Sequence, residues 1–83
     1  MPYIAENKRD RFRETLSKMP KFNDKGELEY VVFYLMKHYM KDREYRYSIL
    51  HDVTYAVMHC ADEFRRRYLD KRETQARKSN GDI

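Results

Sequence analysis

The side chains that could bind a metal or catalyse a reaction gather in one stretch, between residues 51 and 63. His59 is followed directly by Cys60, and Glu63 stands four residues after His59, which would place the two on one face of a helix. Adjacent helical residues point about 100° apart, so His59 and Cys60 cannot hold one tetrahedral zinc ion without ligands from elsewhere. No third and fourth ligand is evident in the sequence. We therefore expect no metal site and no cofactor.

The sequence also offers little for covalent or acid–base catalysis. Cys60 is the only cysteine of the chain, and it falls within an apolar helical stripe, where a thiol would be buried and inert. Asp62 and Glu63 are adjacent and would point apart on a helix, so they do not make a general acid–base pair. Two glycines in 83 residues leave no glycine-rich phosphate loop. We expect no catalytic residues and a protein that is not an enzyme.

Tyrosine and arginine are the more informative residue types, with eight tyrosines in 83 residues. Tyrosine supplies rigid amphipathic contact area and arginine recognises anions in a bidentate manner, a mixture that suits protein interfaces and nucleotide pockets between helices. The alternative is that the tyrosines lie at the rim of a thin core with their hydroxyls in water. The candidate binding residues lie in helical rows and in an arginine run: Tyr30, Tyr34, Lys37, Tyr55, His59, Arg65 and Arg66.

These residues must be positioned by helices. An apolar arm over residues 1–5 precedes a first helix, predicted over residues 6–19 and stopped by Pro20. A second helix is predicted over residues 27–40. It is apolar around nearly its whole circumference, which favours a central position. The same segment has some strand character, but its length and its i, i+3, i+4 pattern favour a helix.

The strongest pattern begins at Ser48, a residue type well suited to cap a helix N-terminus. A third helix should run from Ser48 to an end between Asp70 and Glu73, followed by a polar tail over residues 74–83. We expect an all-α domain over residues 1–73 with three helices, the third being long, and a flexible tail, with docking of its last residues as the alternative. The apolar stripe along the third helix consists of Ile49, Val53, Ala56, Val57, Cys60, Phe64 and Tyr68.

The third helix is longer than the helix that should cover it. At about 1.5 Å per residue it would extend about 36 Å, whereas the second helix would extend about 21 Å. The far end of the stripe, with Phe64, Tyr68 and Leu69, therefore needs another cover. The first helix, the arm, the tail or another subunit could supply it, and we favour a homo-oligomer, most simply a dimer.

Charge and composition limit the classes of partner and the cellular compartment that we expect. The net charge of +4 is spread thinly, with six basic against four acidic residues over 1–24, five against four over 25–47, and seven against six over 48–83. This distribution lacks the continuous basic groove of a nucleic-acid-binding protein. No run of 18 apolar residues could span a membrane, and residues 1–8 lack the apolar region of a secretion signal. A single cysteine cannot form an intramolecular disulfide, which agrees with a reducing compartment, so we expect a cytoplasmic protein.

Four short segments resemble a family of small uncharacterised proteins from bacteria and their phages. These are residues 1–4 (MPYI), 26–32 (GELEYVV), 63–67 (EFRRR) and 80–83 (NGDI). Similar words occur in that family in the same order, as an MPYI start, GELNYV-like and EFYRR-like segments, and an ENGDV-like end. The resemblance spans nearly the whole chain and implies a small all-helical domain, without an assigned activity or binding residue.

Two departures from that family pattern fall near the end of the third helix. Arg65 stands where the family has a tyrosine, and Tyr68 begins a segment where the family has a proline. Without that proline the helix can continue, so its end stays open at this point. A phage setting, implied by the resemblance, favours a small protein that acts on a host factor.

We therefore expect a non-enzymatic interaction protein that binds and blocks or modulates a host protein. The alternative is an oligomeric binder of a small anionic nucleotide signal, and nucleic-acid binding is a further alternative.

Overall fold

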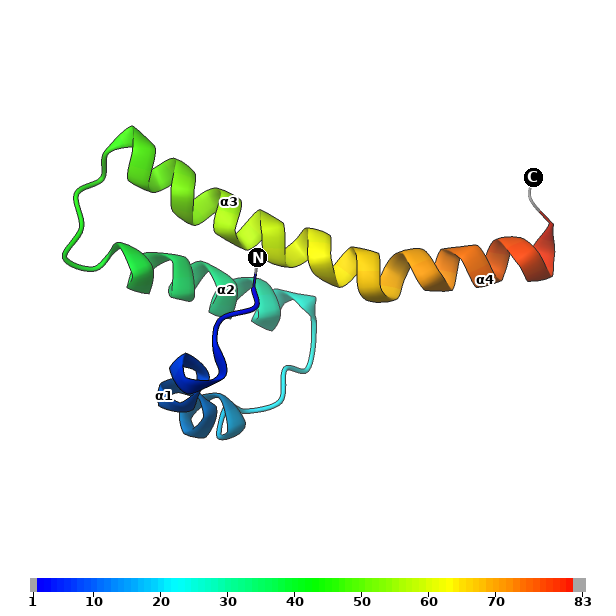
Figure 1. Ribbon diagram of the computed structural model, residues 1–83, viewed down its shortest axis with the longest axis horizontal. Helices are drawn as coiled ribbons and strands as arrows, with labels where there is room; N and C mark the ends of the chain where they lie inside the picture. Colours follow the sequence, from blue (N-terminus) through cyan, green and yellow to red (C-terminus); the bar gives the residue numbers. More distant parts are fainter. Residues whose placement is uncertain (1, 82–83) are drawn as a thin grey trace.

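The protein is all-α, as the sequence predicts. A computed structural model describes residues 2–81, in which 78% of the chain is helical and no strand occurs. The helices are α1 (Glu6–Ser17), α2 (Lys25–Met40), α3 (Tyr47–Phe64) and α4 (Asp70–Asn80), with a π-helical segment η1 (Arg65–Leu69) between the last two. The elements α3, η1 and α4 form one continuous rod of 34 residues, so the domain has three helices with a long third one (Figure 1).

Helix α2 begins two residues before the predicted start, because Asp24 caps it. The Asp24 carboxylate accepts a hydrogen bond of 2.8 Å from the Glu27 N–H. In return, the Glu27 carboxylate accepts one of 2.7 Å from the Asn23 N–H. These two reciprocal hydrogen bonds resemble a capping box, and they determine the residue at which the helix begins. By contrast, α1 ends at Ser17, two residues before its predicted end.

The start of α3 differs from the prediction. The N-cap is Arg46, not Ser48, and no side chain caps this helix end. The Arg46 carbonyl accepts from the N–H groups of Ile49 and Leu50, so the helix already includes Tyr47. Ser48 therefore lies inside the first turn, and the prediction that it caps the helix is wrong.

The end of the long helix also differs from the prediction. The sequence placed the end between Asp70 and Glu73, but helix continues to Asn80, and Gly81 with a φ of 94° ends it. Residues 74–80 are thus helical rather than a flexible tail. The η1 segment is one wider turn within the rod, in which the Asp70 N–H donates to the Arg65 carbonyl. The predicted docking of the last two residues lies outside the described residues.

Helices α2 and α3 lie side by side and antiparallel, and they form the only helix–helix packing between separate helices within residues 2–81 (Figure 1). No Cα atom of α1 comes within 8 Å of another helix in this part of the chain. The prediction that α2 is a central helix is therefore wrong for the single chain, because only α3 covers it. Six of its large apolar side chains are between 42% and 72% exposed, namely Leu28, Tyr30, Phe33, Tyr34, Leu35 and Tyr39.

The apolar stripe is covered over its first half only. Val53 is buried and Ile49 and Val57 are half-buried against α2, whereas Cys60 is exposed. Beyond the start of α2 lies an open patch, consisting of Phe64, Tyr68 and Leu69, with exposed fractions of 65%, 52% and 49%. The lengths explain this, since α2 spans about 24 Å and the rod about 51 Å at 1.5 Å per residue. Met40 and Val53 are the only buried residues among those described.

None of the helices within residues 2–81 is both long and apolar enough to cross a membrane.

Candidate interaction surface

The N-terminal arm is fixed to the long helix where α3 passes into η1. Arg67 donates a hydrogen bond of 2.8 Å to the Tyr3 hydroxyl, and its guanidinium carbon lies 5.9 Å from the centre of the Tyr3 ring. This contact joins residues 64 positions apart in sequence. It therefore holds the arm beside the part of the long helix that α2 does not reach.

Glu63 is the acidic centre of this contact. Its side chain is only 16% exposed, and it accepts a hydrogen bond of 2.8 Å from the Arg66 guanidinium. A hydrogen bond from the Tyr3 hydroxyl, followed by that of Arg66, lowers the pKa of Glu63. The Tyr3 hydroxyl likewise raises the pKa of Arg67. The N-terminal arm therefore contacts the Glu63 carboxylate, which stays ionised at neutral pH.

A hollow of about 640 Å³ lies beside this contact. It brings together three residues that the sequence predicts for binding, namely His59, Arg65 and Arg66. Two carboxylates, Asp62 and Glu63, share the same hollow. Its charge is therefore mixed, and the Arg66 side chain is already paired with Glu63.

Tyr30 and Tyr34 belong to a different surface, on α2. The covered residues of α2 are Val31 and a row at steps of four, Val32, Met36 and Met40, and α3 is the helix that packs against α2. Tyr30, Tyr34 and Lys37 fall on the opposite side of the helix by their spacing, and all three are exposed. The Tyr34 ring stacks on His38 with ring centres 6.4 Å apart.

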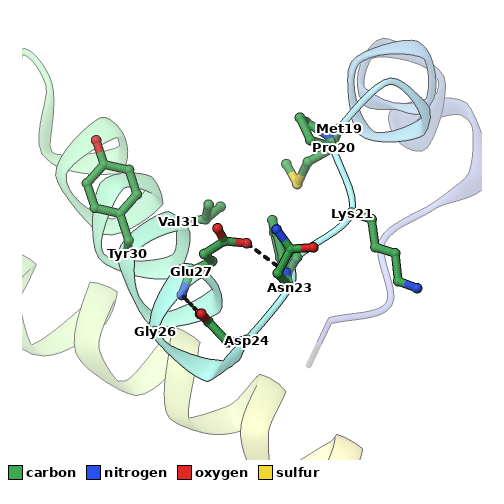
Figure 2. Close-up of a pocket in the computed structure, with 10 residues that line it drawn as sticks. Met19, Pro20, Lys21, Asn23, Asp24, Gly26, Glu27, Tyr30 and Val31 are labelled. Atoms are coloured by element: carbon green, nitrogen blue, oxygen red, sulfur yellow. Dashed lines mark hydrogen bonds between the residues drawn. The ribbon is translucent and has the colours of Figure 1, made fainter.

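Tyr30 also lines a second hollow, of about 580 Å³, between α2 and the segment that connects it to α1 (Figure 2). Met19, Pro20 and Val31 are among its apolar lining residues, and the hydrogen-bonded residues Asp24 and Glu27 at the helix start also line it. Figure 2 shows that these residues come from the connection and from the first turns of α2. None of the residues that line this hollow belongs to η1.

Along α3, four aromatic side chains at steps of four form a ladder of rings, defined by Tyr47, His51, Tyr55 and His59. Successive ring centres are 5.9, 4.2 and 6.4 Å apart. The binding residues predicted from the sequence include Tyr55 and His59 but not Tyr47 and His51. The i, i+4 repeat of ring side chains is the signal that could have found them. All four residues are exposed.

The predicted binding residues are thus divided between two surfaces. His59, Arg65 and Arg66 meet at one hollow, and Tyr55 joins them through its ring contact with His59. Tyr30, Tyr34 and Lys37 stand apart on the outer side of α2. The assignment of these seven residues to binding stays a prediction. Within residues 2–81 no group of three or more histidine, cysteine or carboxylate side chains is placed to hold a metal ion.

Comparison with known proteins places the chain in one family. No curated protein and no solved structure matches it. The model of a family described as a domain of unknown function, DUF6899, matches residues 1–83. Because this match spans the whole chain, the protein belongs to the DUF6899 family.

Proposed function

We propose that this protein is a non-enzymatic interaction protein that binds a partner protein through its exposed aromatic rows and thereby blocks or modulates that partner. The observation that supports this proposal is the exposure of tyrosine rings on the outer sides of both α2 and α3. Tyr30, for example, is 72% exposed, although it lies in the middle of an apolar helix. Tyrosine and arginine are the residues that most often dominate binding energy at protein interfaces.

The geometry of the ladder supports the same proposal. Its rings are already held against each other along a rigid helix, so little side-chain entropy is lost when a partner covers them. The neighbouring Arg65 and Arg66 add donors for acidic groups at the same end of α3. The family resemblance adds a setting in bacteria and their phages, in which the partner is a host protein of the cytoplasm.

The proposal is tested by affinity capture from a bacterial lysate, followed by binding of the identified partner in purified form. Replacing Tyr30 and Tyr34 together by alanine should weaken binding about 30-fold or more, the effect of losing one strong interface anchor. The matched control is Tyr45→Ala, since Tyr45 is similarly exposed but lies between α2 and α3. Equal binding of wild type and the double variant, and of a Tyr55→Ala variant, would refute the proposal.

A second candidate function is the binding of a small anionic nucleotide at the hollow beside the N-terminal arm. Its volume of about 640 Å³ falls within the range of ligand pockets, and His59, Arg65 and Arg66 line it. The two carboxylates in the same hollow weigh against this candidate. A thermal-shift panel of nucleotides tests it, because a ligand at 100 times its Kd stabilises the native state by about 2.7 kcal/mol. An unchanged Tm with every nucleotide would exclude it.

A further inference from the structure

We propose that a second copy of this chain covers the open patch of the long helix, so that the folded unit is a dimer in which each copy completes the core of the other. This inference does not rest on the proposed function, because it concerns the open patch and not the outer tyrosine rows.

The single chain exposes much more surface than a compact monomer of the same mass. The single chain has an accessible surface of 8073 Å², whereas a compact monomer of 10.3 kDa exposes about 5,400 Å². The excess is therefore about 2,700 Å². The Cα radius of gyration of 16.6 Å agrees with this, since a compact domain of this length has about 12 Å.

Part of this exposed surface is the open apolar patch on the long helix. In the open patch, the Phe64 and Tyr68 rings pack against each other with centres 4.8 Å apart, and Leu69 extends the apolar surface. The patch continues the stripe that α2 covers at the other end of α3. The N-terminal arm reaches its edge, where Tyr3 contacts Arg67, but leaves all three side chains about half exposed or more.

A second copy of the chain is the occupant that fits this open patch. Obligate homodimers bury roughly 2,000–5,000 Å² or more in total, or about 1,000–2,500 Å² per copy, so the excess of about 2,700 Å² lies at the upper end of what a dimer can cover. With only Met40 and Val53 buried among the described residues, the cover has to be present whenever the chain is folded. A second copy is the one partner that is always synthesised alongside the chain in equal amount. A twofold pairing also lets the same apolar patch serve both copies.

The charges around the patch permit self-association. Arg66 forms an ion pair of 2.6 Å with Glu63, and Arg67 is engaged by Tyr3. The arginine run therefore does not present three free charges to an approaching copy. The net charge of +4 is small and spread along the chain, so repulsion between copies is weak.

The mass of the purified full-length chain in solution tests the proposal. Light scattering at about 50 μM should give twice the chain mass of 10.3 kDa. Phe64→Asp, which puts a charge into the patch, should give the mass of one chain at the same concentration. The matched control is Tyr47→Asp, an aromatic-to-aspartate change on the same helix at a residue 83% exposed and outside the patch, which should remain dimeric. A wild-type chain that is helical by circular dichroism but has the mass of one chain would overturn the proposal.

The reactivity of the Cys60 thiol tests the proposal in the wild-type chain, so this test does not require a variant to fold. Cys60 is exposed in the single chain and adjoins the open patch, so a second copy should cover it. In the wild type, the Cys60 thiol should react with a disulfide reagent at least about tenfold more slowly than in urea-unfolded chain, and Phe64→Ala should abolish that protection. Reaction of wild-type Cys60 at the rate of the unfolded chain would also overturn the proposal.

Discussion

At the scale of single residues, the contact between Tyr3, Glu63 and Arg67 is the only tie in the described chain between the N-terminal arm and the long helix that involves a side-chain hydrogen bond. It connects two parts of the sequence that both carry short apolar segments. In this contact the Tyr3 hydroxyl lies between the Glu63 carboxylate and the Arg67 guanidinium. The hydroxyl can then donate to the first and accept from the second.

This arrangement predicts a pH dependence. The pKa of Glu63 is held below its ordinary value of 4.5, chiefly by the Tyr3 hydroxyl. Its contribution to stability is therefore complete above about pH 4.5 and is lost as the pH falls through the lower pKa of the folded state. Tyr3→Phe removes the hydrogen bond, so the pKa of Glu63 should rise toward 4.5 and the loss of stability on acidification should become smaller.

A carbon-detected NMR titration of the Glu63 carboxyl measures this pKa directly. Tyr45→Phe, which removes a hydroxyl from a tyrosine far from Glu63 in sequence, is the control and should leave the titration midpoint unchanged. A midpoint that is the same in wild type and Tyr3→Phe would show that the hydroxyl does not act on Glu63.

At the scale of helices, the start of α2 carries a testable cap. Asp24→Ala removes the acceptor for the Glu27 N–H, and loss of such a cap costs about 1 kcal/mol of unfolding free energy. Asn23→Ala is the matched control, because Asn23 contributes its backbone N–H, which alanine retains. Urea denaturation at one protein concentration measures both variants. A similar loss in the two would mean that the cap does not stabilise α2.

Helical periodicity predicted the order and type of all the helices, and the structure shows why it misplaced two ends of the long one. The period of apolar residues indicates packing, and it stops at Leu69 because no partner lies beyond. Helix continues there because residues 70–80 are mostly good helix formers and contain neither proline nor glycine. At the other end, Ser48 has the right chemistry for a cap, but the backbone already satisfies the first N–H groups from Arg46.

The candidate site could be predicted only in part for a related reason. Rows such as Tyr30 and Tyr34 follow from spacing within one helix, so the sequence reveals them. The meeting of His59 and Arg65 with the N-terminal arm depends on how the arm crosses the long helix, and no local pattern encodes that. The pairing of Arg66 with Glu63 at i, i+3 was readable, but its effect on the charge of the hollow needed the structure.

At the scale of the whole molecule, a fold that is completed by a second copy should depend on concentration. If unfolding converts one folded dimer into two unfolded chains, each tenfold increase in protein concentration stabilises the dimer by about 1.4 kcal/mol. With an unfolding entropy of about 2.1 cal/mol/K per residue over two chains, the Tm should rise by about 4 °C for each tenfold increase in protein concentration.

Thermal melts followed by circular dichroism, at protein concentrations from about 2 to about 200 μM, measure this slope. The Tyr47→Asp control should keep this slope, whereas Phe64→Asp, whose single chains lack the cover, should show no cooperative melting of helix in this concentration range. A wild-type Tm that is constant over this range would mean that the thin core formed by α2 and α3 is stable in a single chain.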